Sequence, residues 1–161
     1  MRILGIDPGT GILGFGVIEA DKGKAQLVDA GVIRTPVKED DAVRLATIFD
    51  ELSDIIAAAK PVEMAIEKLY FAQNITTAMT VAQARGVAIL AGQQAGLKIA
   101  EYTPLQVKQA LTGYGRADKK QMQEMVRVLL GLKDVPQPDD CADALAVAIC
   151  HAGTLHSKIR A

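Results

Sequence analysis

The sequence predicts an α/β fold in which helices cover both faces of a five-stranded mixed sheet. Two observations lead to this prediction. Half of the 161 residues are hydrophobic, with no tryptophan, a composition typical of a cytosolic α/β protein with a substantial core. Three β-like segments come first, and helical and β-like segments then alternate, as in sheets that combine antiparallel strands with helical crossovers. We expect a single domain over residues 1–161.

Three apolar segments open the chain, separated by Gly-containing turns or charged loops. This pattern predicts an antiparallel meander. The segments cover residues 2–7, 11–19 and 25–35. Apolar residues at helical spacing then predict an amphipathic helix over 43–59, which ends before Pro61.

The second half of the chain continues the alternation. Residues 63–70 and 97–102 are short, largely apolar segments of strand type, and an Ala-rich helix over 74–95 connects them. Three further helices are expected over 104–111, 118–132 and 139–155. Helical crossovers make the first, fourth and fifth strands parallel. Sites in such sheets tend to lie at the carboxyl ends of the strands.

Charge and cysteine content restrict the class of protein. A net charge of −1 does not by itself suggest a nucleic-acid binder. However, five basic and only two acidic residues lie between Lys108 and Arg127, which gives either a basic binding zone or a solvated helix face. Cys141 and Cys150 lie nine residues apart on one expected helix and cannot form a disulfide. With no apolar run of membrane-spanning length and no signal peptide, we expect a cytoplasmic protein.

In the segment "ILGIDPGTG" (3–11), an apolar strand ends at Asp7 and a glycine-containing turn follows. Burying one carboxylate costs several kcal/mol unless it is paired or binds a metal. Asp7 is therefore either a strand-end cap or the first part of a site. The choice depends on whether the fold brings other carboxylates close to it.

Three later carboxylates fit the second interpretation. Glu67 shares a strand face with Ala65 and lies among apolar residues, although an edge-strand charge facing water is the alternative. Asp140 and Asp143 are three residues apart and continue the apolar stripe of the last helix. Acids in a first helical turn also complement the helix dipole, and we expect Asp139 to be the N-terminal cap.

A group of four carboxylates needs positive charge, because like charges a few ångströms apart repel. Oxygen ligands suit hard divalent cations, above all Mg²⁺, with Mn²⁺ able to substitute. Two such ions about 3.5–4 Å apart can activate water and stabilise the leaving oxygen in phosphodiester cleavage. The sequence therefore predicts a site with two Mg²⁺ ions.

With these acids in place, the sequence resembles the RuvC family of Holliday junction resolvases, which have a ribonuclease H-like fold. The similar segments occur in family order across almost the whole chain. They are "ILGIDPGTGILGFGVI" (3–18), "MAIEKLYFAQN" (64–74), "AQARGVAI" (82–89), "EYTPLQVKQALTGYGRADKKQMQEMV" (101–126) and "PQPDDCADALAVAICH" (136–151). The resemblance implies a homodimeric, metal-dependent endonuclease that nicks two strands of four-way junction DNA symmetrically, in homologous recombination and DNA repair. It also implies a branch-migration motor as partner.

The resemblance also implies roles for individual residues. The catalytic and metal-binding acids would be Asp7, Glu67, Asp140 and Asp143, and some family members carry histidine at the position of Asp140. Lys119 would be catalytic as well as DNA-binding, by stabilising charge in the transition state. The remaining DNA-binding residues would be Lys108, Arg116 and Lys120, at phosphates, and Tyr70 or Phe71, on unpaired bases. Each basic residue could equally be a solvated surface charge, and one of the two aromatic residues could belong to the core.

The Ala-rich helix and the glycine turn after Asp7 each allow more than one interpretation. The Ala-rich helix over 74–95 could form the dimer interface or pack between the sheet and neighbouring helices. The glycine turn after Asp7 also resembles the phosphate loop of actin-like ATPases, and the opening strand resembles that of small ribosomal-RNA-processing nucleases. A non-catalytic junction binder is a third alternative. The chain is short for the ATPases, and neither "AQARG" nor the lysines at 108 and 119 fit the RNA nucleases.

Overall fold

The computed structural model describes residues 1–9, 11–36, 38–69 and 75–160. Five strands and five helices follow one another over these residues. The strands are β1 (Arg2–Asp7), β2 (Ile12–Asp21), β3 (Lys24–Arg34), β4 (Glu63–Glu67) and β5 (Lys98–Tyr102). The helices are α1 (Asp41–Ala59), α2 (Ile75–Gln94), α3 (Pro104–Thr112), α4 (Lys119–Leu129) and α5 (Asp139–Arg160).

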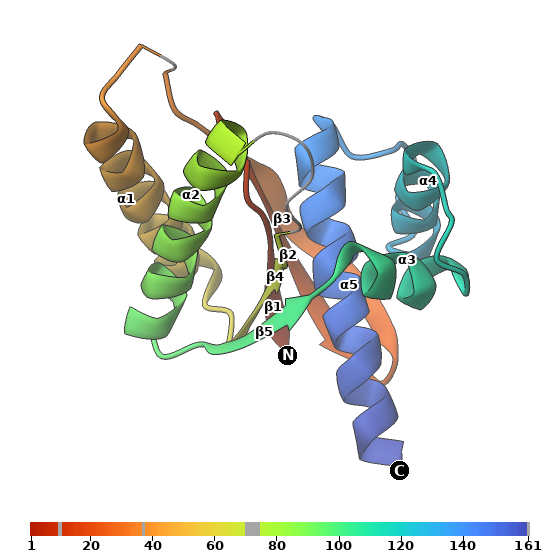
Figure 1. Cartoon of the computed structure of the whole chain (residues 1–161). Coiled ribbons are helices and arrows are strands. Elements are labelled where there is room, and N and C mark those ends of the chain that lie inside the picture. Colours follow the sequence, from red (N-terminus) through yellow and green to blue (C-terminus); the bar gives the residue numbers. More distant parts are fainter. Residues whose placement is uncertain (10, 37, 70–74, 161) are drawn as a thin grey trace.

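The strands form one mixed sheet in the order β3-β2-β1-β4-β5. The β1–β2 and β2–β3 pairs are antiparallel, whereas β1–β4 and β4–β5 are parallel. Helices α1 and α2 cover one face of this sheet, and α3, α4 and α5 lie on the other (Figure 1). The predicted α/β class, the five-stranded mixed sheet and the helices on both faces are thus confirmed.

Element ends differ most from the predictions at three places. The strand expected over 63–70 ends at Glu67, because its partner β5 ends at Tyr102 and helix α3 begins at Pro104. Helix α4 ends at Leu129 rather than at 132, shortly before Gly131 adopts a positive φ of 64°. Helix α5 continues past the expected end at 155 to Arg160.

Glycines let α5 lie directly on the sheet. A Cβ on Gly5 of β1 would be 2.0 Å from the Ala144 carbonyl oxygen, and one on Gly14 of β2 would be 2.1 Å from that of Asp140. A Cβ on Gly16 would likewise meet the side chain of Leu145 at 2.6 Å. Because these distances exclude any side chain, the three glycines set how closely the helix backbone approaches β1 and β2.

A buried polar network also attaches α5 to the sheet. The Tyr102 hydroxyl lies 2.7 Å from Nδ1 of His151, and Nε2 of the same ring lies 2.6 Å from a Glu63 carboxylate oxygen. His151 is buried on α5, while its two partners belong to β5 and β4. Buried polar groups need such partners, so the network favours one position of α5 along the sheet.

No helix in the described part of the chain is long and apolar enough to cross a membrane.

Replacing Gly5 by alanine should destabilise the fold by about 3 kcal/mol, because the added methyl group forces α5 away from β1. Urea unfolding would measure the loss. The matched control is Gly153→Ala on α5, where an added Cβ would meet nothing within 4 Å. This control change should stabilise the helix by about 0.5–1 kcal/mol. Equal stability of Gly5→Ala and the parent chain would contradict the role given to this glycine.

Candidate active site

Asp7 and Glu67 end two adjacent parallel strands. The register pairs Ile6 of β1 with Ile66 of β4, so the two carboxylates follow next to each other at the carboxyl edge of the sheet. Ile6 and Ile66 belong to the core on the α1–α2 side. Since side chains alternate along a strand, Asp7 and Glu67 point to the opposite face, which carries α5.

The first turn of α5 brings Asp140 and Asp143 to the same place. Gly14 pairs directly with Asp7 in the sheet, and the backbone of Asp140 lies against Gly14. The residue three positions further along, Asp143, lies on the same side of the helix. The glycine contact that docks α5 therefore also sets the distance between its acids and Asp7.

The acids influence each other's protonation. Burial, and then the charges of Asp143, Glu67 and Asp140, raise the pKa of Asp7 from 3.8 to about 7. Burial and the charge of Asp143 raise the pKa of Glu67. Burial also raises the pKa of Asp143, against the opposing effect of Lys119. The structure thus brings all four sequence-predicted acids into one electrostatic group.

Lys119 is the basic residue in contact with this group. Its Nζ lies 3.2 Å from an oxygen of Asp139 and 3.3 Å from one of Asp143. A capping box between Asp118 and Gln121 fixes the start of α4 and so places Lys119. Burial acts to lower the pKa of Lys119, but Asp143 and Asp139 outweigh it and leave the pKa raised. Lys119 is therefore held as a cation.

Asp139 differs from its predicted role as the residue that caps α5. It is the first helical residue, and its carboxylate pairs with Lys119. Pro138 precedes the helix instead, and its carbonyl accepts a hydrogen bond from the Cys141 amide.

The remaining predicted DNA-binding residues occupy different positions. Lys108 on α3 is half-buried, and its charge acts to lower the pKa of Glu67, so it lies on the Glu67 side of the acids. Arg116 and Lys120 are exposed around the start of α4 and, among the described residues, their side chains make no hydrogen bond or ion pair. Tyr70 and Phe71 lie outside the described residues.

The donor set fits a hard divalent cation. The four acids offer oxygen ligands alone, and burial together with the charges of the other acids keeps the pKa of Asp7 raised although Lys119 acts to lower it. Within the described ranges, no three His, Cys, Asp or Glu side chains converge as closely as bound ligands do. Asp7, Glu67, Asp140 and Asp143 are therefore candidate ligands by chemistry and position.

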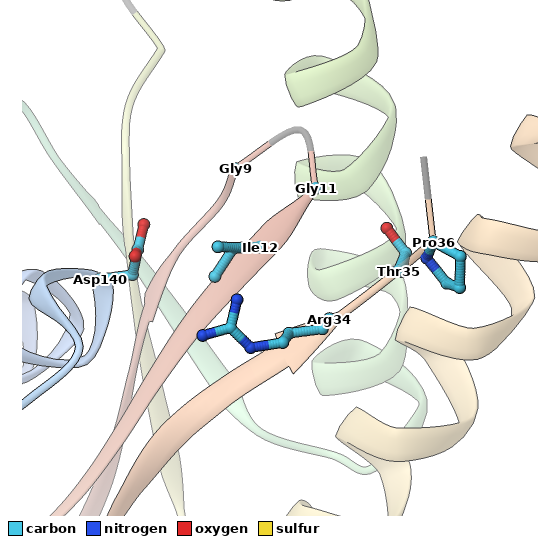
Figure 2. A pocket seen from close by; sticks show the side chains of 7 residues that line it. All are labelled: Gly9, Gly11, Ile12, Arg34, Thr35, Pro36 and Asp140. Carbon is cyan, nitrogen blue, oxygen red and sulfur yellow. The ribbon is translucent and has the colours of Figure 1, made fainter. Parts of the chain in front are cut away.

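A hollow of about 640 Å³ opens beside Asp140. Figure 2 shows its lining, which comes from the β1–β2 turn, the start of β2, the end of β3 and α5. The lining residues are Gly9, Gly11, Ile12, Arg34, Thr35, Pro36 and Asp140. Sequence reasoning missed Arg34. The topology could have revealed it, because the third strand of a meander ends at the same sheet edge as the first.

The order of strands and the helices on both faces define a ribonuclease H-like domain. The family model for the crossover junction endodeoxyribonuclease RuvC matches residues 3–151. The crossover junction endodeoxyribonuclease RuvC of Heliobacterium modesticaldum is 56% identical over 155 residues, which cover 96% of each chain.

Two solved structures agree with this similarity. A Thermus thermophilus RuvC structure has a TM-score of 0.92 at 37% identity, covering 98% of this chain and 97% of that one. The T. thermophilus RuvC in complex with Holliday junction substrate has a TM-score of 0.89 at 34% identity, and the match covers 98% of this chain and 96% of that one. The chain belongs to the RuvC family, whose members are nucleases acting on DNA phosphodiester bonds. This result favours the predicted family over the ATPase and RNA-nuclease alternatives.

The metal-free protein should lose stability as the pH rises from about 4 to about 7. Because the native pKa of Asp7 lies above its ordinary value, the native state keeps a proton that the unfolded chain has released in this range. The stabilisation that comes from this retained proton is fully present below the pKa of Asp7 in the unfolded chain. It is lost as the pH rises through the pKa of Asp7 in the native state. Urea unfolding with a chelator, at about pH 5 and about pH 7.5, would measure a fall of a few kcal/mol.

The change Asp7→Asn removes the titrating group and should flatten this pH dependence. Asp54→Asn, at an exposed position of α1, serves as the control and should retain it. Parallel pH profiles for the two variants would show that Asp7 does not carry the effect.

Proposed function

We propose that this enzyme cuts two strands of a four-way DNA junction symmetrically, as a homodimer, by hydrolysis that depends on two Mg²⁺ ions. The observation that supports the proposal is the position of four carboxylates from β1, β4 and α5 at one sheet edge, where the charges of three of them raise the pKa of the fourth, Asp7. Membership of the RuvC family supports the choice of substrate, since a relative was solved in complex with Holliday junction substrate.

In this proposal Asp7, Glu67, Asp140 and Asp143 hold the ions. Bound Mg²⁺, or Mn²⁺ in its place, supplies activation of water and neutralisation of charge at the scissile phosphate. Asp7, whose pKa is raised by the charges of the other three acids, would hold the ions together with Glu67 and Asp143. Asp140 is either a ligand or the group that orients the attacking water.

Lys119 and its neighbours act on the DNA rather than on the ions. The raised pKa keeps Lys119 protonated, so it can stabilise negative charge that develops on the phosphate. Lys108, on the Glu67 side, and the exposed Arg116 and Lys120 bind backbone phosphates, which position the DNA without reading its sequence. Tyr70 or Phe71 stacks on unpaired bases at the crossover.

The exposed face of α2 is the proposed dimer interface. Met79 and Leu90 are 60% and 49% exposed, so two large apolar side chains of this helix face solvent. Ala82 and Gly86 lie between them at helical spacing, and a Cβ on Gly86 would meet nothing within 4 Å. A second copy related by a two-fold axis would cover this face and set two active sites against two strands.

The proposed setting is homologous recombination and DNA repair in the cytoplasm, with a branch-migration motor as partner. Junctions that such a motor moves along DNA would then be resolved by paired cuts.

Asp7→Asn should abolish cutting and preserve junction binding. The change keeps the shape of the side chain but replaces the carboxylate of a proposed metal ligand by a neutral amide, so the cleavage rate should fall roughly 1,000-fold, equivalent to about 4 kcal/mol. Cleavage of a labelled synthetic four-way junction with Mg²⁺, together with a gel-shift assay, would measure both properties. Asp54→Asn is the control. Cleavage retained by Asp7→Asn would refute the mechanism.

The same assay tests the substrate. Paired symmetrical nicks should appear on the junction, while a linear duplex, a flap and an RNA–DNA hybrid remain intact. Preferential cutting of the hybrid would instead indicate an RNA nuclease.

Leu90→Glu should convert the dimer to a monomer, because it places a charge on the apolar α2 face. Sedimentation velocity would measure the mass, and paired nicking should become single nicking. Val128→Glu is the matched control, since Val128 is 53% exposed on α4, away from α2. A parent chain that sediments as a monomer, or a Leu90→Glu dimer, would exclude this interface.

A further inference from the structure

The hollow beside Asp140 contains a positive charge that the proposed mechanism leaves unused. Ile12 of β2 pairs with Arg34 of β3, and two residues further along β2, Gly14 pairs with Val32. Residues two apart on a strand share a face, so Arg34 lies on the same face as Val32. Val32 packs against the core under α5. By strand alternation, Arg34 points to the same face as α5, and Asp140 lies over Gly14.

The guanidinium of Arg34 is available to a ligand. Arg34 is exposed, and within the described ranges its side chain forms no ion pair or hydrogen bond. Figure 2 shows the side chain extending from β3, past Ile12, toward the side on which Asp140 lies. Arg34 lines the same hollow as Asp140 and pairs with no carboxylate of the described residues, so its guanidinium is free to bind an anion.

The wall behind Arg34 is fixed. Thr35 is 5% exposed, and its amide donates to the Gly11 carbonyl at 3.0 Å, which ties the end of β3 to the β1–β2 turn. Arg44 of α1 donates from Nε to the Thr35 hydroxyl at 3.2 Å. The Arg44 side chain is 15% exposed and its Nη1 lies 3.6 Å from a carboxylate oxygen of Asp41, so this side chain is held in place behind the hollow. A Cβ on Gly9 would be 2.1 Å from the Ile12 carbonyl oxygen, which keeps this turn narrow.

Lys119 and Arg34 lie beside different acids of the first turn of α5. Lys119 contacts Asp139 and Asp143, whereas Asp140 lines the hollow with Arg34. DNA reaches the acids as a chain of phosphates, and carboxylates repel every phosphate that no cation neutralises. A strand that passes the acids therefore meets Lys119 on one side and Arg34 on the other.

We propose that Arg34 binds the phosphate adjacent to the scissile one, on the side of the cut strand away from Lys119. This inference rests on the proposed junction cleavage. A guanidinium can form two parallel hydrogen bonds to a phosphate, so the hollow holds one nucleotide step in a fixed position relative to the acids. Arg34 is a positioning residue, because it contacts the DNA away from the reacting atoms.

Junction binding and cleavage by Arg34→Ala test this inference. Affinity should fall about 5- to 20-fold, and the slope of log affinity against log salt should become shallower by about 0.9, the value for one lost phosphate contact. The maximal single-turnover rate at saturating protein should stay within about threefold, since the acids are untouched. Arg34→Lys should restore the salt slope but only part of the affinity.

Lys24→Ala is the matched control, because Lys24 is exposed at the opposite end of the same strand. It should leave both affinity and salt slope unchanged. A fall in affinity as large as that of Arg34→Ala would mean a general effect of charge and would overturn the inference.

A neutral methylphosphonate, placed in turn at each phosphate that flanks the cut, locates the contact. At one flanking position the parent enzyme should lose about as much affinity as Arg34→Ala loses, and combining the two changes should cost no more than either alone. Additive losses at every position would overturn the inference. A parent chain that does not cut junctions would overturn the proposed function, whereas an active parent with Arg34→Ala at full affinity would overturn this inference alone.

Discussion

The close approach of α5 to β1 and β2 is the constraint on which the site depends. Gly5, Gly14 and Gly16 leave the sheet without side chains where the helix backbone crosses it. The spacing between helix and sheet is therefore fixed by contact with the helix backbone at Gly5 and Gly14, and by contact with the Leu145 side chain at Gly16. The buried contact between His151 and Glu63 adds a polar anchor further along α5. Together these contacts place acids from distant parts of the sequence within range of one another's charge.

That arrangement costs stability. Burial raises the pKa of Asp7, Glu67 and Asp143, so the fold holds these groups where ionisation is unfavourable. Lys119 offsets part of the repulsion through Asp143, but a single exposed lysine cannot balance four acids. Remaining unbalanced charge at a rigid edge is what a site for divalent cations requires, and it is typical of functional sites.

The sequence carried enough information to predict the sheet and the grouping of the acids, because topology decides both. Once β1 and β4 are parallel neighbours, Asp7 and Glu67 must end at one edge, and an apolar stripe on α5 requires the helix to dock there. Sequence patterns could not show which glycines permit close docking, since turn and packing glycines look alike. They also could not show that Asp139 pairs with Lys119, because an acid in a first helical turn fits a cap equally well.

The same topology that places the acids also explains the hollow. In an antiparallel meander, β3 ends at the edge where β1 ends, so Arg34 reaches the site from the side opposite the α3–α4 segment. A cluster of carboxylates with cations on one side would attract DNA only from that side and leave the strand without a defined direction. Cations on two sides, held by separate elements, define a path across the acids. In this proposal the meander is therefore part of the DNA-binding surface as well as the support of the strand that carries Asp7.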